Sequence, residues 1–96
     1  MTIKQNTSDD KRVKIFKALA EVKRIEILRY LYHEKYKNSC GEIGDAIGMY
    51  KSNVSYHLKI MIEADLIIFG REGQQKIIQI KEDTFNEFLP GFLSTL

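Results

Sequence analysis

The sequence predicts a small, mostly α-helical domain that carries one β-hairpin. Apolar residues recur at helical spacing from near the N-terminus up to about residue 64. Two β-prone runs, at residues 66–69 and 76–80, then flank a stretch rich in turn-forming residues. Helical spacing returns near the C-terminus. The expected order is therefore four helices, two strands and a last helix, and 96 residues suffice for one domain over residues 1–96.

The first helix is expected over about residues 8–20. Ser8 is a candidate N-cap, and Asp9 and Asp10 place negative charge at the positive end of the helix dipole. Its apolar residues cover more than one stripe, which is typical of a helix that packs both on its own domain and on a partner. These residues are Val13, Ile15, Phe16, Leu19 and Ala20.

The second helix is expected over about residues 21–34, with Arg24 off its apolar line. That line comprises Val22, Ile25, Leu28 and Leu31, with Tyr32. A polar break at residues 35–38 follows. Ser39 and Glu42 then form an S-x-x-E capping box that opens a short third helix.

A helix-turn-helix is predicted next. Gly48 ends the short helix, and a longer helix follows over about residues 51–64 after a tight turn. Its inward face carries Val54, Leu58, Met61 and Ile62. Residues 70–74 supply the turn of the hairpin, whose imperfect alternation leaves its register open.

The C-terminal segment, about residues 84–96, reads as a helix with an apolar stripe. Thr84 and Glu87 offer a second capping box, and Pro90 is expected to kink or break the helix within residues 89–91. The stripe comprises Phe85, Phe88, Leu89, Phe92, Leu93 and Leu96.

The outward face of the 51–64 helix is the main candidate site. Hydroxyls, an amide and lysines suit base edges and phosphates, and residues 51–62 contain no acidic side chain. The candidates are Lys51, Ser52, Asn53, Ser55, Tyr56 and Lys59. An ordinary solvated helix face is the alternative. His57 is expected to tuck against the domain with a satisfied ring nitrogen, and a phosphate contact stays open.

The hairpin tip adds Arg71, Gln74 and Lys76, which could reach a phosphate or the minor groove. Surface hairpins also carry such residues for solubility. The net charge of +2 is too small to indicate nucleic-acid binding by itself, so the basic surface must come from local placement.

Three stretches carry a family resemblance: "FKALAEVKRIEILRYL", "CGEIGDAIGMYKSNVSYHLKIMIEADLI" and "FGREGQQKIIQI". Their most specific parts are Ala-Leu-Ala-x-x-x-Arg, Val-Ser-x-His-Leu and Arg-Glu-Gly. Over about residues 13–80 the chain resembles the ArsR/SmtB family of prokaryotic winged-helix repressors. The resemblance implies a winged helix-turn-helix dimer that occupies a promoter and leaves it when an effector binds.

Carried over by position, the resemblance places Lys51, Ser52, Asn53, Ser55, Tyr56 and His57 in the DNA-reading helix, and Arg71 and Gln74 in the wing. Two departures stand out. Val22 occupies a position where proline is common, and Tyr56 one where many members have arginine.

The family's metal-sensing motifs are missing. Many members have a Cys-x-Cys pair before the recognition helix, or histidine and acidic ligands on the last helix, whereas Cys40 is this chain's only cysteine. We therefore expect no metal and no cofactor, and leave open an unidentified small-molecule or redox effector. Cys40 could be a redox sensor or a small, half-buried side chain.

Other classes of protein are disfavoured. The chain lacks a nucleophile elbow, a phosphate loop and a metal-hydrolase motif, so we expect no enzyme. A single cysteine, no leader and no run of about 18 apolar residues predict a cytoplasmic protein without a membrane role.

The functional expectation is a dimeric, sequence-specific DNA-binding regulator, a repressor on an inverted-repeat operator in double-stranded DNA. Both apolar stripes at the chain ends lack a partner, which predicts a homodimer. Its interface is expected to use Val13, Phe16, Phe85, Phe88, Phe92 and Leu93. The alternative is a winged-helix adaptor that binds protein and not DNA.

Overall fold

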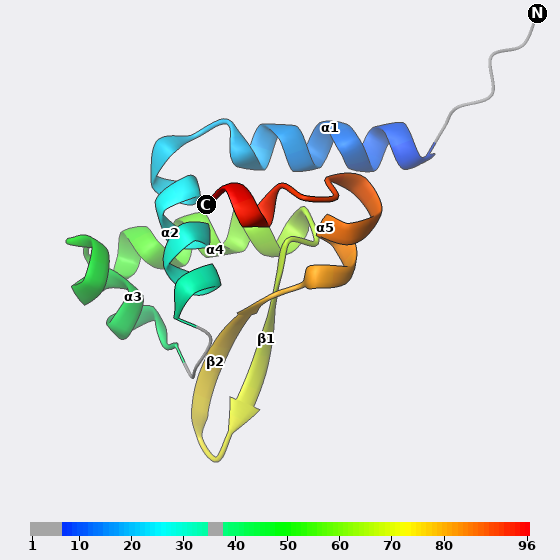
Figure 1. Cartoon of the computed structure of the whole chain (residues 1–96). Coiled ribbons are helices and arrows are strands. Elements are labelled where there is room, and N and C mark those ends of the chain that lie inside the picture. Colours follow the sequence, from blue (N-terminus) through cyan, green and yellow to red (C-terminus); the bar gives the residue numbers. More distant parts are fainter. Residues whose placement is uncertain (1–6, 35–37) are drawn as a thin grey trace, which may run out of the picture.

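The computed structural model describes residues 7–34 and 38–96. Residues 35–37 of the expected polar break lie outside this range. The elements are α1 (Thr7–Leu19), α2 (Val22–His33), α3 (Cys40–Ile47), α4 (Lys51–Glu63), β1 (Ile67–Glu72), β2 (Gln75–Ile80), α5 (Glu82–Phe88) and the short 3-10 helix η1 (Leu93–Thr95). This is the predicted winged helix-turn-helix order, with the hairpin projecting away from the helices (Figure 1).

The helix-turn-helix forms through the local signals read in the sequence. The Ser39 hydroxyl accepts from the backbone N–H of Glu42, and the Glu42 carboxylate accepts from the N–H of Ser39, both at 3.2 Å, so the capping box is confirmed. Gly48 ends α3 in the left-handed conformation at φ 71°. At Gly44, a Cβ atom would lie 2.5 Å from the carbonyl oxygen of Met49, so only glycine fits where the turn crosses α3.

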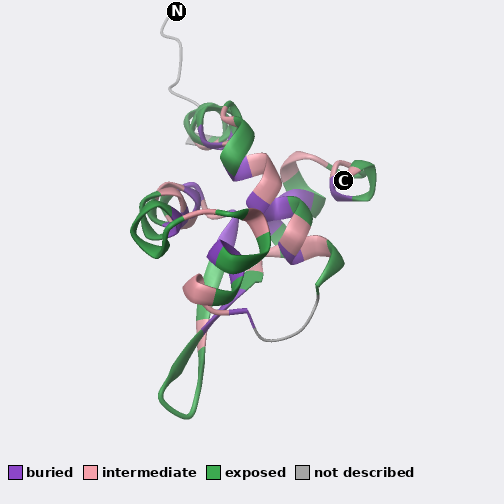
Figure 2. Cartoon of the chain, turned by 90° about the vertical axis from the view of Figure 1, so that its left-hand side faces the viewer, coloured by how far each residue is buried: buried purple, intermediate pink, exposed green. Residues whose placement is uncertain are grey.

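One core joins the helices to the base of the hairpin, and the outer half of the hairpin is exposed (Figure 2). Ile27 and Leu28 of α2 pack there with Leu58 and Met61 of α4 and Ile67 of β1. The core therefore sets the outward face of α4 and the base of the wing in fixed positions. Within the part of the chain that the structure describes, no helix is both long and apolar enough to cross a membrane.

The hairpin is longer than predicted. Its antiparallel register pairs Ile67 with Ile80 and Glu72 with Gln75, which leaves a two-residue turn of Gly73 and Gln74. The turn lies within the expected residues 70–74 but is shorter, because cross-strand pairing continues through Gly70, Arg71 and Glu72. Gly73 supplies the positive φ, 62°, that so short a turn requires.

Two expected caps are wrong. Ser8 lies inside α1, which begins at Thr7. Thr84 lies inside α5, which begins at Glu82, and its buried hydroxyl donates to Asp65 at 3.1 Å instead of capping the helix. The break at Pro90 is confirmed, because α5 ends at Phe88 and the chain turns through Gly91 at φ 84°.

Candidate nucleic-acid interface

The outward face of α4 is open along its first turns. Lys51, Ser52, Asn53, Tyr56 and Lys59 are exposed. Of the inward residues, Val54, Leu58 and Met61 are buried and Ile62 is half-buried. No acidic residue lies in the first turn of this helix. Amide, hydroxyl and lysine groups therefore face the solvent together. Side chains that contact base edges and phosphates need this exposure.

Tyr50 extends this face, and the sequence reading missed it. It precedes α4 as its N-cap, makes no side-chain capping bond and is 82% exposed. A phenol ring and hydroxyl beside Lys51 can contact a sugar-phosphate backbone. The sequence offered one signal for Tyr50. It stands in the turn of the helix-turn-helix, where packing does not require an aromatic side chain.

Ser55 is exposed, but its hydroxyl has a partner inside the protein. It lies 3.8 Å from the Cys40 sulfur at the start of α3. Cys40 itself is half-buried, which agrees with its expectation as a small, half-buried side chain. Ser55 therefore joins the two helices of the motif as well as facing outward.

His57 is tied to α2 by Arg24. The guanidinium Nη1 lies 3.1 Å from Nδ1 of His57, and other N–H groups of Arg24 donate to the backbone carbonyls of Ala18 and Lys17. Arginine can only donate, so Nδ1 accepts and the ring proton sits on Nε2. The expected satisfied ring nitrogen is confirmed.

Arg24 was expected off the apolar line, but it is buried, with 9% of its surface exposed. Its charge is accommodated because two carbonyls and the imidazole accept its hydrogen bonds. Val22, expected on that line, is instead 68% exposed, because the helix begins there and Glu21 is its N-cap.

Burial lowers the pKa of His57 below its usual 6.5. Glu21 opposes this shift, whereas the positive charges of Arg24 and Lys23 add to it. The lowered pKa favours the neutral ring at the centre of α4.

The wing concentrates positive charge on one face. Arg71 lies directly opposite Lys76 in the β-ladder, and both side chains are exposed. The Lys76 ammonium also lies 5.2 Å from the centroid of the Phe69 ring. Like charges directly opposite each other destabilise a strand pair. Gln74 is exposed in the turn beside them.

The residues expected in a dimer interface divide into two groups. Val13 and Phe16 of α1 are 50% and 55% exposed, and Phe88 and Phe92 are partly exposed. Phe85 and Leu93 were also expected there, but both are buried inside the protomer, with Phe85 2% exposed.

The break at Pro90 explains that correction. The predicted apolar stripe assumed one continuous helix. The chain instead turns back after Phe88 and brings Phe92 onto Phe85. Their rings stack with centroids 6.0 Å apart. Phe85 and Leu93 therefore stabilise the protomer.

No metal site joins this surface. Over residues 7–34 and 38–96, three or more His, Cys, Asp or Glu side chains nowhere gather closely enough to hold a metal ion.

Comparison with known proteins now assigns the family. A family model described as a helix-turn-helix domain matches residues 19–68. The uncharacterized HTH-type transcriptional regulator YceK of Bacillus subtilis (strain 168) is 44% identical over 97 residues, which cover 100% of this chain and 95% of YceK. The arsenical resistance operon repressor of the same organism is 32% identical over 77% of this chain and 70% of its own length. The chain belongs to the ArsR/SmtB family.

A solved structure supports the assignment of this chain to the ArsR/SmtB family. The homodimeric winged helix-turn-helix DNA-binding domain of Mb0332 from Mycobacterium bovis superposes with a TM-score of 0.75 at 26% identity, covering 91% of this chain and 83% of that one. The protein is therefore a transcriptional regulator with a helix-turn-helix DNA-binding fold, and it is not an enzyme. The matched range contains Arg24, Tyr50 and all of α4.

Proposed function

We propose that this ArsR/SmtB regulator is a cytoplasmic, homodimeric repressor that binds an inverted-repeat operator. The exposed, acid-free start of α4 is the observation that carries the proposal. A helix of this kind enters the major groove with its N-terminal residues against the base edges.

Within α4, Ser52, Asn53 and Tyr56 would read bases, because all three are exposed on the outward face. Lys51 and Lys59 would hold phosphates. Ser55 would do so by turning its one hydroxyl proton from the Cys40 sulfur to a phosphate oxygen. His57 would donate from Nε2 to a phosphate, since Nδ1 is already occupied by Arg24.

The wing would add a second contact to the same duplex. Arg71 and Lys76 lie opposite each other and would bind a backbone phosphate together. Gln74, at the tip, would reach the adjacent minor groove.

Dimerisation would pair α1 and the C-terminal segment of two chains. Val13 and Phe16 leave large apolar surfaces in water, and partly exposed Phe88 and Phe92 would join them. The homodimeric state of the Mb0332 domain supports a two-fold arrangement here. The name of the arsenical resistance operon repressor supports repression.

An effector would release the operator by binding the two states of different DNA affinity unequally. We expect no metal in this role, because the described residues hold no cluster of metal ligands.

In vitro selection of duplex DNA by the purified protein tests the proposal. We expect an inverted repeat whose half-sites are one helical turn, about 10 base pairs, or a multiple apart. Selection of a single unrepeated site would contradict the dimeric mode. Enrichment of no sequence would favour the protein-binding adaptor, for which exposed Ile68 and Phe69 offer apolar side chains on the two faces of the wing.

A further inference from the structure

Asp65 has a backbone conformation that is uncommon outside glycine. It follows the C-terminus of α4 with φ 63°, and in the described parts of the chain it is the one residue other than glycine with a positive φ. Side chains with a Cβ disfavour this left-handed region, which glycine adopts readily. The carboxylate at this position therefore calls for an explanation beyond the shape of the turn.

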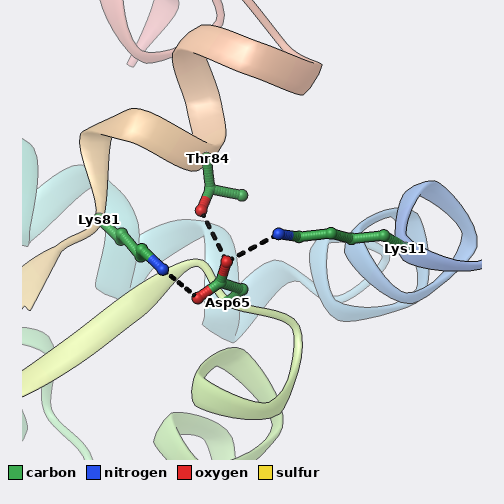
Figure 3. Close-up of polar contacts among 4 residues, drawn as sticks. All are labelled: Lys11, Asp65, Lys81 and Thr84. Carbon is green, nitrogen blue, oxygen red and sulfur yellow. Dashed lines mark hydrogen bonds and ion pairs between the residues drawn. The ribbon is translucent and has the colours of Figure 1, made fainter. Parts of the chain in front are cut away.

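Both carboxylate oxygens of Asp65 are engaged by distant parts of the chain (Figure 3). The Lys81 ammonium donates to Oδ1 at 2.8 Å, the Lys11 ammonium donates to Oδ2 at 2.8 Å, and the Thr84 hydroxyl donates to Oδ2 at 3.1 Å. These hydrogen bonds, that of Lys11 first, lower the pKa of Asp65 to about 2. The group is thus a fixed anion at physiological pH.

The partners of Asp65 come from the two elements of the proposed dimer face. Lys11 lies on α1 near Val13 in sequence, while Lys81 and Thr84 lie at the start of α5. The Lys11 ammonium also lies 5.2 Å from the centroid of the Phe88 ring. Asp65 itself joins α4 to β1. One carboxylate therefore connects α1 and α5 to the point where the DNA-reading helix ends and the wing begins.

We propose that Asp65 is a positioning residue that fixes the dimer face relative to the DNA-reading helix. This inference rests on the proposed function, because the spacing of two α4 helices matters only in a dimer. In such a dimer, the orientation of α1 and α5 against α4 sets the separation of the recognition helices, and hence the half-site spacing that binds best. Losing the carboxylate loosens that orientation and weakens the preference for one spacing.

The test compares Asp65→Gly and Asp65→Asn with wild type on the selected operator and on operators whose spacer is one or two base pairs longer or shorter. Glycine and asparagine both accept a positive φ, so the turn is preserved while the anion is removed. We expect about tenfold weaker binding at the best spacing and a smaller loss at the others, so that spacer preference flattens. Lys11→Gln, which removes the α1 partner and leaves the turn intact, should flatten it too.

Glu26→Gln is the matched control. Glu26 pairs with Lys23 at 3.2 Å within α2, so the variant removes the same charge without touching the contacts between elements. It should keep the wild-type spacer preference. Circular dichroism at the assay temperature checks that each variant is folded.

The outcomes separate the two proposals. If wild type has a sharp spacer preference that Asp65→Gly shares, the positioning role is wrong and the proposed function stands. A parallel loss on all spacers would mean that Asp65 only stabilises the fold, and would also overturn the inference. A wild-type protein without any spacer preference would contradict the proposed dimer and this inference together.

Discussion

The Arg24 guanidinium donates to Nδ1 of His57 across 3.1 Å and so ties α2 to the middle of α4. The same side chain donates to the Ala18 and Lys17 carbonyls at the end of α1. Three helices are thus held together by one buried cation. This explains why arginine ends the Ala-Leu-Ala-x-x-x-Arg motif.

Arg24→Ala should lower the free energy of unfolding by about 1–3 kcal/mol, because it leaves buried acceptors without donors. Arg24→Lys should recover only part of the loss, since one ammonium cannot reproduce the guanidinium fork. Urea unfolding measures both. Arg29→Ala, on the exposed side of α2, is the control and should change stability by no more than about 0.5 kcal/mol. Equal losses at the two positions would contradict the buried role of Arg24.

His57 should make stability depend on pH. Its pKa is lowered from 6.5 in the folded protein, so the unfolded chain binds more protons as pH falls through this value. The contribution of the neutral ring to the free energy of unfolding is therefore fully present above pH 6.5, and it is lost as the pH falls toward the lowered pKa. Urea midpoints between about pH 8 and pH 5 should fall more for wild type than for His57→Gln. Parallel curves for the two proteins would exclude this coupling.

Gly44→Ala should destabilise the helix-turn-helix by about 1–3 kcal/mol, because the new methyl group meets the Met49 carbonyl at 2.5 Å. Gly41→Ala in the same helix is the matched control. Its Cβ would have no neighbour closer than the Ser39 hydroxyl at 3.9 Å, and alanine favours the helix by about 0.5–1 kcal/mol. Thermal unfolding should give opposite signs for the two variants, and the same sign would refute the close crossing.

The helices and the helix-turn-helix were predictable because their signals are local. Ser39, Glu42 and Gly48 act on backbone groups within a few residues of themselves, so their effects can be read along the chain. Pro90 acted in the same way.

The errors came from partners distant in sequence. Arg24 looked like a surface residue because Ala18 and His57 lie on two other elements. Thr84 fits a capping pattern, but the Asp65 carboxylate takes its hydroxyl. Phe85 was assigned to an exposed stripe that exists only if the helix continues past Pro90. The face of α4 was easier, since helical geometry alone separates its inward and outward residues.

Lys51→Ala and Arg71→Ala should weaken binding to all duplexes to a similar degree and reduce the salt dependence by about one ion each. Both side chains are exposed where a phosphate would lie. Fluorescence anisotropy at several salt concentrations measures the slope. An unchanged slope in either variant would remove that residue from the phosphate contacts.

Asn53→Ala should lose about 1–3 kcal/mol of binding free energy on the selected operator and much less on random DNA, as expected for an amide that reads a base edge. The same anisotropy titration compares the two duplexes. Equal losses on both would mean that Asn53 reads no base.

Zinc, cadmium, nickel and arsenite should not release the protein from its operator, because its described residues hold no cluster of metal ligands. Elemental analysis of the purified protein should find less than one metal per subunit. One bound metal per subunit, with loss of DNA binding on its addition, would point to ligands shared between subunits.

The most direct measurement of the central proposal is the affinity of the purified protein for its selected inverted repeat and for a scrambled duplex, each over a range of salt concentrations. We expect two protomers per duplex, tight binding that weakens steeply with salt, and a preference for the repeat of at least about 10³-fold. Weak binding that is equal on both duplexes and insensitive to salt would contradict sequence-specific regulation through α4 and the wing.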